Sequence, residues 1–183
     1  MTRCLDIFLS LLGLIVLSPL WVVLIVLGYA NLRSPLFRQP RVGRHQKPFV
    51  LLKFRSMEVN TASVATHLAD VSAITSYGRF LRRSKLDELP QLWNVLRGDM
   101  SLVGPRPCLT NQDELIRERA QRGVFEVRPG ITGLAQVQEI DMSTPKLLAE
   151  TDQRMISGFS LRNYLKYIMM TVGGKGSGDR VKM

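Results

Sequence analysis

The sequence predicts an α+β protein that is mostly helical and carries a membrane-associated segment at its N-terminus. Residues 7–32 contain no charged side chain, whereas the chain from Arg33 onward is charged and predominantly basic. In this second part, short β-like runs bounded by Pro and Gly alternate with longer segments of helical periodicity. The length of 183 residues fits one modest domain with an additional apolar segment.

The apolar segment is long enough to cross a hydrocarbon core of ~30 Å as a helix, and it is too long for a secretory signal. Pro19 lies in its middle and must bend a helix, and Ser18 can hydrogen-bond the freed backbone. Basic residues flank both ends, with Arg3 before the segment and Arg33 after it. Because positive flanks prefer the cytoplasm, the segment is either a kinked spanning helix or a re-entrant hairpin hinged at Ser18 and Pro19. The residues alone leave both open.

The elements of the basic part follow from turn residues, helix caps and periodicity. Short strands are expected over residues 36–39 and 49–54. A strand followed by a turn is expected within the stretch 99–107, and a strand and turn within the stretch 125–137. Helices are expected over residues 74–83, 87–98, 111–123, 143–156 and 160–172, with a loop over 60–73. Asn111 has a Glu three residues later, which predicts a capped helix start. Either Ser143 or Thr144 caps the helix that has Pro145 in its first turn.

The last predicted helix has an apolar stripe with basic neighbours. The stripe consists of Leu161, Leu165, Ile168 and Met169, and Arg162 and Lys166 lie beside it. Such a pattern suits a helix that lies on a membrane surface. It suits a helix packed on a protein core nearly as well, so both interpretations stay open.

The formal net charge of +10 indicates an anionic partner, such as nucleic acid, lipid headgroups or a phosphorylated substrate. A solvated basic face without a partner is the simpler alternative. Cys4 and Cys108 form no metal-binding spacing or disulfide framework, which fits a reducing compartment. His45 and His67 are isolated in the sequence, which argues against a His-based catalytic triad.

Asp87 and Glu88 are adjacent carboxylates in a basic surround that includes Arg82. If Asp87 caps a helix, Pro90 falls in the first turn, where its missing N–H costs nothing. We therefore expect Asp87 at a helix N-terminus, a position that favours ionised carboxylates and phosphate. The alternative is that Asp87 is only a cap and Glu88 only a first-turn charge.

Several cations are held in rigid or patterned positions. Lys53 and Arg55 alternate on a predicted strand and so share a face. Arg106 lies between two prolines, and Arg128 precedes a Pro-Gly pair. Pre-organised arginines suit bidentate phosphate binding, although each alone could be a structural salt-bridge partner. Together with the paired carboxylates they predict a diphosphate site with Mg²⁺, which prefers carboxylate and phosphate oxygens.

Three stretches carry a resemblance to a known family: "KFRSM", "RRSKLDELPQLWNVLRGDMSLVGPRP" and "VRPGITGLAQV". They resemble the signature blocks of the bacterial sugar transferase family, the monotopic phosphoglycosyl transferases that start lipid-linked glycan assembly. The resemblance extends to about Thr171, and the length is similar to that of the smallest members. It implies a re-entrant membrane hairpin over residues 1–32, a cytoplasmic catalytic domain over 33–172 and a flexible basic tail over 173–183.

The resemblance also implies a location and an activity. A break at Ser18 and Pro19 would keep both termini on the cytoplasmic face of the bacterial inner membrane. Asp87 would attack a UDP-sugar, release UMP and hold the phosphosugar covalently until a polyprenyl phosphate, such as undecaprenyl phosphate, accepts it. Glu88 would help with Mg²⁺ or with activation. A homodimer is left open as the assembly.

The resemblance further implies contacts to substrate phosphate from a set of basic residues: Arg82, Arg106, Arg55, Arg128 and, less strongly, Lys53. Two departures from the family pattern leave the accepted sugar undefined. The stretch "QVQEIDMSTPK" replaces a frequent Asn-Gly-Arg, and Tyr164 stands where many relatives have Asp.

Two other functions compete with this one. A non-catalytic membrane-bound scaffold of the same fold would not need the intact pair Asp87 and Glu88. A basic nucleic-acid-binding module would need interleaved aromatic residues for stacking, and these are sparse. We therefore expect no nucleic-acid partner.

Overall fold

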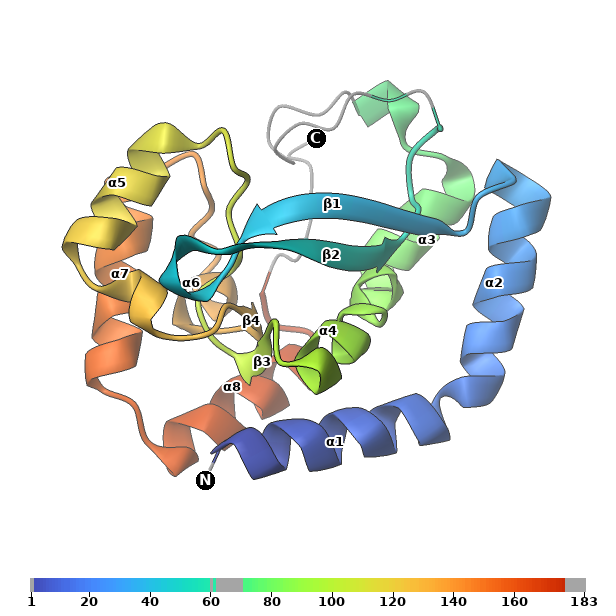
Figure 1. Ribbon diagram of the computed structural model, residues 1–183. Helices are drawn as coiled ribbons and strands as arrows, with labels where there is room; N and C mark the ends of the chain where they lie inside the picture. The colour runs from blue at the N-terminus through green and yellow to red at the C-terminus, as the bar shows by residue number, and fades with distance from the viewer. Residues whose placement is uncertain (1, 60, 62–70, 177–183) are drawn as a thin grey trace.

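The computed structural model describes residues 2–59, 61 and 71–176. Two N-terminal helices form an L along the lower edge and one side of the molecule, and the remaining elements fill the angle between them (Figure 1). Most of the predicted loop over residues 60–73, and the end of the predicted tail from residue 177, lie outside the described residues.

The two N-terminal helices are α1 (Thr2–Val16) and α2 (Ser18–Leu32), and their axes differ by 65°. Pro19 lies in the first turn of α2 and has no N–H to donate to the carbonyl of Ile15. The Ser18 hydroxyl donates to that carbonyl instead, at 2.8 Å. The predicted break is thereby confirmed, and the predicted use of Ser18 is confirmed with it.

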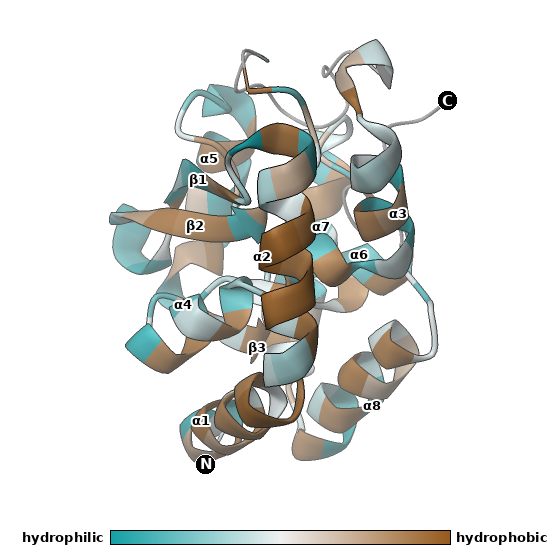
Figure 2. Cartoon of the chain, turned by 90° about the vertical axis from the view of Figure 1, so that its right-hand side faces the viewer, coloured by the Kyte–Doolittle hydropathy of each residue, from teal (hydrophilic) through white to brown (hydrophobic). Residues whose placement is uncertain are grey.

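Among the described residues, no helix is by itself long and apolar enough to cross a membrane, but α1 and α2 taken together satisfy the same length and composition test. Both helices leave large apolar side chains exposed. On α1 these include Phe8, Leu11, Leu12, Ile15 and Val16. Figure 2, coloured by residue hydropathy, shows that α1 and α2 consist mostly of hydrophobic residues.

The chain continues as a β-hairpin and two short helices. β1 (Leu36–Val42) pairs antiparallel with β2 (Pro48–Phe54), through the 3₁₀ turn η1 (Arg44–Gln46). After the 3₁₀ turn η3 (Val71–Ala73) come α3 (Ser76–Ser84), the 3₁₀ turn η4 (Leu86–Glu88) and α4 (Gln91–Arg97). The predicted strands are confirmed, with β1 three residues longer than expected. The helix predicted over 74–83 is confirmed within two residues, and Gly98 ends α4 with φ 93°, as predicted.

The second half is built around a parallel pair of three-residue strands, β3 (Ser101–Val103) and β4 (Gly130–Thr132). Between and after them lie α5 (Asp113–Gln121), the 3₁₀ turn η5 (Val124–Glu126), α6 (Leu134–Val137), α7 (Pro145–Ser157) and α8 (Leu161–Val172). The predicted cap at Asn111 is wrong, because α5 starts two residues later and Gln112 precedes it without a side-chain bond. Thr144 precedes α7, as one of the two predicted alternatives had it.

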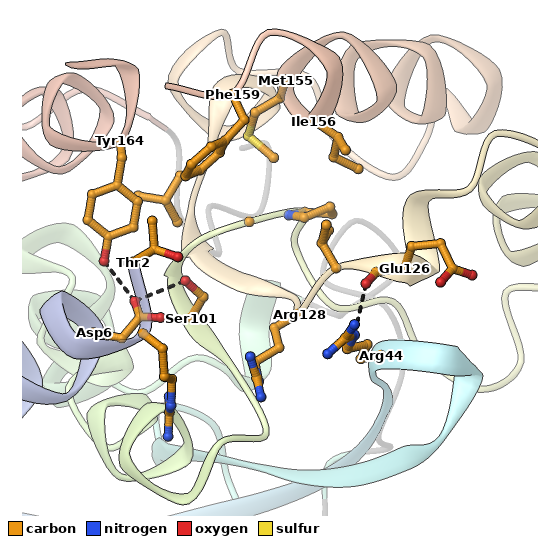
Figure 3. Close-up of a pocket in the computed structure, with 15 residues that line it drawn as sticks. Thr2, Asp6, Arg44, Ser101, Glu126, Arg128, Met155, Ile156, Phe159 and Tyr164 are labelled. Atoms are coloured by element: carbon orange, nitrogen blue, oxygen red, sulfur yellow. Dashed lines mark hydrogen bonds between the residues drawn. The ribbon is translucent and has the colours of Figure 1, made fainter. Parts of the chain in front are cut away.

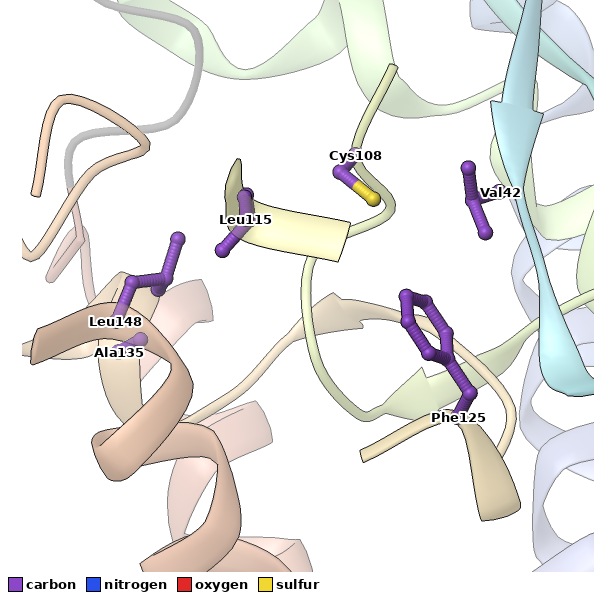
Figure 4. Packing of buried hydrophobic residues seen from close by; sticks show 6 residues of the cluster. All are labelled: Val42, Cys108, Leu115, Phe125, Ala135 and Leu148. Carbon is purple, nitrogen blue, oxygen red and sulfur yellow. The ribbon is translucent and has the colours of Figure 1, made fainter. Parts of the chain in front are cut away.

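A hydrophobic cluster joins the hairpin to α5 and α7. Figure 4 shows its buried members: Val42, Cys108, Leu115, Phe125, Ala135 and Leu148. Beside this cluster Arg119 is 1% exposed, and it donates from Nε and Nη2 to the Asp152 carboxylate at 3.0 and 2.7 Å. A charged pair this deeply buried costs solvation, so it is tolerated only with such two-point geometry.

α8 buries residues outside the predicted apolar stripe. Tyr164 and Tyr167 are its buried residues, whereas Leu161, Leu165 and Met169 of the predicted stripe are exposed. For these three residues the core-helix interpretation is wrong. Their exposure leaves an apolar row on the surface near the start of α1 (Figure 1).

Candidate functional site

Asp87 and Glu88 lie in η4, between α3 and α4, and both are buried. The prediction that Asp87 caps a helix is wrong. Lys85 has φ 59° and ends α3 in a left-handed conformation, so the next residues form a 3₁₀ turn. α4 begins only after Pro90. The local cap rule identified the turn but placed the helix start three residues too early.

Two cations converge on the Glu88 carboxylate from different parts of the chain. Arg106 Nη2 donates to Glu88 Oε1 at 2.6 Å, and Lys53 Nζ lies 3.8 Å from the same oxygen. All three side chains are largely shielded from water, so these charges interact more strongly than exposed ones. The structure thus brings together both predicted acidic residues and two of the predicted cations.

The turn that carries Arg106 is held rigidly by its backbone. Each carbonyl from Pro105 to Cys108 accepts a hydrogen bond; the donors are, in order, Gly130 N (2.9 Å), Arg119 Nη1 (2.8 Å), Arg41 Nη1 (3.0 Å) and Val42 N (3.0 Å). The buried pair of Arg119 and Asp152 therefore supports the site directly. The prediction of a pre-organised Arg106 is confirmed by this geometry.

Arg82 contacts Ser56, and Arg55 lies apart from the carboxylate pair. Arg82 lies on α3, one turn before η4, and donates to the hydroxyl of buried Ser56 at 2.8 Å. Arg55 donates to the carbonyls of Ser34 (3.2 Å) and Leu36 (3.4 Å), and its guanidinium lies over the Phe37 ring. In the described part of the chain, Arg55 makes no contact with the carboxylate pair.

Arg128 is also placed away from the carboxylates. Its Nε donates to the Gly98 carbonyl at 2.8 Å, at the end of α4, and its side chain lines a separate cavity (Figure 3). That Arg128 contacts the substrate phosphate is therefore a prediction that the observed geometry does not favour.

The sequence interpretation missed a polar contact that fastens α1 to the domain. Asp6 is 2% exposed, and its Oδ1 accepts hydrogen bonds from Tyr164 Oη (2.7 Å), Ser101 Oγ (2.9 Å) and Leu102 N (2.8 Å) (Figure 3). Burial raises the pKa of Tyr164 above its usual 10, and the Asp6 carboxylate raises it further, so the phenol stays a neutral donor. The sequence did contain a signal for this contact, because Asp6 is the one acidic residue of the largely apolar helix α1.

Arg3 fastens the same helix to α4. Its guanidinium donates to the carbonyls of Val95 (2.6 Å) and Leu96 (2.9 Å), in the last turn of α4. A cation there satisfies free carbonyls and complements the helix dipole. Arg3 is thus a structural partner of the domain as well as a charge flanking the apolar segment.

The carboxylate pair is compatible with a Mg²⁺ ion shared with substrate. In the residues that the structure describes, no group of three or more His, Cys, Asp or Glu side chains could hold a metal on its own. Mg²⁺ is commonly bound by one or two carboxylates together with phosphate oxygens and water. Asp87 and Glu88 fit such a role, with a substrate diphosphate completing the coordination.

Comparison with known proteins gives matches over most of the chain. Residues 1–175 match the family model described as bacterial sugar transferase. The chain is 40% identical over 161 residues to the uncharacterized sugar transferase EpsL of Bacillus subtilis, covering 87% of this chain and 77% of that protein. It is 40% identical over 177 residues to a UDP-glucose:undecaprenyl-phosphate glucose-1-phosphate transferase of Klebsiella pneumoniae, covering 91% of this chain and 38% of that protein.

A protein of the same name from Caulobacter vibrioides is 39% identical over 186 residues, covering 93% of this chain and 67% of that protein. The chain therefore spans between about two fifths and three quarters of the length of these relatives. The match over nearly its whole length, together with the carboxylate pair and its two cations, shows that the chain belongs to the bacterial sugar transferase family.

Proposed function

We propose that the protein transfers a sugar-1-phosphate from a UDP-sugar to a polyprenyl phosphate, with undecaprenyl phosphate as the natural acceptor, and releases UMP. The observation that carries this proposal is the buried carboxylate pair Asp87 and Glu88, of which Glu88 accepts a hydrogen bond from the rigidly held Arg106. The names of the relatives from Klebsiella pneumoniae and Caulobacter vibrioides point to the same class of reaction.

The chemistry is a double displacement at one phosphorus atom. A carboxylate oxygen of Asp87 attacks the sugar-bearing phosphorus, the bond to the bridging oxygen breaks, and UMP leaves with the electron pair. An oxygen of the polyprenyl phosphate then attacks the same phosphorus and releases the carboxylate. Glu88 is engaged by Arg106 and Lys53. The resemblance to the family motif assigns the nucleophile to Asp87, the first carboxylate of the pair.

Fixed positive charge is what this reaction requires, because negative charge accumulates on phosphate oxygens as UMP leaves. Arg106 is pre-organised by its backbone contacts, so it needs no reorganisation during the reaction. Lys53 adds a second cation, and Arg82 is a further phosphate contact on the preceding helix. Mg²⁺ bound at Asp87 and Glu88 would neutralise further phosphate charge.

We also propose that α1 and α2 form a re-entrant hairpin on the cytoplasmic face of the inner membrane, with both termini cytoplasmic. The exposed apolar rows of α1, α2 and α8 support this placement. A lipid acceptor and a soluble nucleotide sugar could then meet at the membrane surface.

The test uses intact protein, Mg²⁺ and a panel of UDP-sugars without lipid acceptor. Intact mass spectrometry should show a phosphosugar adduct on the peptide containing Asp87, with UMP released. Asp87→Asn should abolish both, whereas Asp113→Asn, at an exposed position on α5, should behave as the native protein. If no adduct forms and UMP appears only after polyprenyl phosphate is added, transfer is direct. Absence of adduct and of UMP even with the acceptor present would favour the scaffold interpretation.

A further inference from the structure

A cavity of about 300 Å³ lies between the first turns of α1, the end of α7 and the chain leading into β4. Figure 3 shows that its two sides differ in chemistry. Met155, Ile156 and Phe159 form an apolar side, and arginines lie on the other. Neither Asp87 nor Glu88 lines the cavity; the turn through Gly104 and Pro105 forms part of its wall and leads to Arg106.

The cavity is positively charged, and part of its hydrogen-bonding capacity is unused. Arg44 Nε donates to the backbone carbonyl of Glu126, and Arg128 Nε donates to the backbone carbonyl of Gly98. In the described part of the chain, the Nη1 and Nη2 groups of both arginines have no partner. Four N–H-bearing nitrogen atoms from two arginines suit a phosphate group.

The two acidic residues at the cavity offset only part of this charge, because Asp6 and Glu126 stand against Arg3, Arg44 and Arg128 in the lining. Asp6 is buried, and its Oδ1 accepts three hydrogen bonds from neutral donors. The Glu126 side chain is 72% exposed, lies 3.6 Å from His45 Nδ1 and extends away from Arg128 (Figure 3). An anion near Arg128 would therefore meet net positive charge.

The position of the cavity identifies the kind of phosphate. Phe159 lines it and is 51% exposed, and two residues later Leu161 begins the exposed apolar row of α8. Thr2 and Arg3 line it from α1, whose exposed row begins with Ile7 and Phe8. A cavity at the meeting point of two apolar surfaces, with cations behind an apolar rim, matches the headgroup level of a bilayer.

We propose that this cavity binds the phosphate of an anionic phospholipid, with Arg44 and Arg128 as donors and Phe159 against the glycerol and upper acyl region. The proposal rests on the proposed membrane association, but not on the transferase chemistry. It gives Arg128 a phosphate ligand different from the sugar substrate.

The test measures binding of the full chain to vesicles of phosphatidylcholine, with and without phosphatidylglycerol. The native protein should bind the mixed vesicles at least tenfold more tightly. The double variant Arg44→Gln/Arg128→Gln should lose most of that preference. The charge-matched control Arg117→Gln/Lys146→Gln changes exposed residues on α5 and at the start of α7, and it should keep the preference.

The alternative outcomes are separable. Equal losses in both double variants would overturn the site in favour of diffuse surface charge. If millimolar glycerol phosphate competes with vesicle binding, the cavity is a site for free phosphate. If the protein prefers only vesicles doped with polyprenyl phosphate, the cavity is a substrate subsite. Either result overturns the proposal. Failure to bind vesicles of either composition would reject the membrane association itself.

A folding defect is controlled separately. Arg44→Lys/Arg128→Lys keeps both charges but loses the planar donors, and it should retain part of the preference. Thermal unfolding of each variant shows whether the loss of the Arg128 bond to Gly98 has disturbed α4. A glutamine variant that unfolds normally and still prefers phosphatidylglycerol would overturn the proposal.

Discussion

Arg119 and Arg106 are joined through one hydrogen bond: the buried guanidinium of Arg119 donates to the backbone carbonyl of Arg106 at 2.8 Å. The same guanidinium is fixed by Asp152, so a salt bridge in the core sets the backbone position of a residue at the site. Arg106 in turn reaches Glu88 at 2.6 Å. The stability of the core and the geometry of the candidate site are therefore linked at this point of the fold.

Arg119→Met should destabilise the protein by about 3–5 kcal/mol, because it leaves the Asp152 carboxylate buried without its partner. Burial already raises the pKa of Asp152, and only the Arg119 charge and hydrogen bond oppose that effect. Urea unfolding measures the change. Arg122→Met removes a less buried partner of Glu118 and should cost less than about 1 kcal/mol. If both variants lose the same stability, the buried pair has no special role.

Arg106→Gln should reduce kcat roughly a hundredfold to a thousandfold, because a fixed charge near the developing phosphate charge is lost. The backbone contacts of the turn do not involve the side chain, so the fold should persist. Steady-state release of UMP measures the rate, and circular dichroism checks the fold. A rise in KM with unchanged kcat would instead place Arg106 in ground-state binding.

Tyr164→Phe should weaken the attachment of α1 and alter the response of stability to high pH. The folded-state pKa of Tyr164 is raised above the unfolded value of about 10. The unfolded chain therefore loses this proton first, and stability falls as pH rises through 10 by up to ~1.4 kcal/mol per unit. Unfolding midpoints at pH 9 and 11 should show a smaller fall in the variant than in the native protein. If stability falls equally in the variant and in the native protein, Tyr164 is not the source of the pH dependence.

The two cysteines should differ sharply in reactivity. Cys4 is exposed on α1, whereas Cys108 is buried in the core and burial raises the pKa of its thiol. In mild detergent a maleimide should modify one thiol, and both only after denaturation. Transfer into vesicles should slow modification of Cys4 if the start of α1 lies within the bilayer surface. Unchanged labelling of Cys4 would argue against that depth.

The sequence predicted those features that depend on neighbouring residues. Turn residues and alternation located both strands of the hairpin, and Pro19 with Ser18 located the bend. The helix cap assigned to Asp87 failed because the local rule does not foresee the left-handed Lys85 that starts the 3₁₀ turn. α6 is only four residues long and has no periodicity to detect.

Long-range polar contacts were beyond any local rule. Asp6 and Tyr164 are 158 residues apart, and Arg3 reaches carbonyls 92 and 93 residues away. The family motifs identified which cations to consider, but the direction of each side chain depends on packing. Lys53 and Arg106 turn to Glu88, whereas Arg128 turns to the end of α4.

The hydrogen bonds of Arg3 to α4 couple the position of α1 mechanically to that of α4. α4 is seven residues long, about 10 Å, and its far end is separated from Glu88 by only two residues. α4 is therefore a short rigid connection between the first turn of α1 and the turn that holds Asp87 and Glu88. If α1 lies in a bilayer as proposed, a tilt of α1 would be transmitted through α4, and the thickness and composition of the lipid would then alter the geometry of the candidate site.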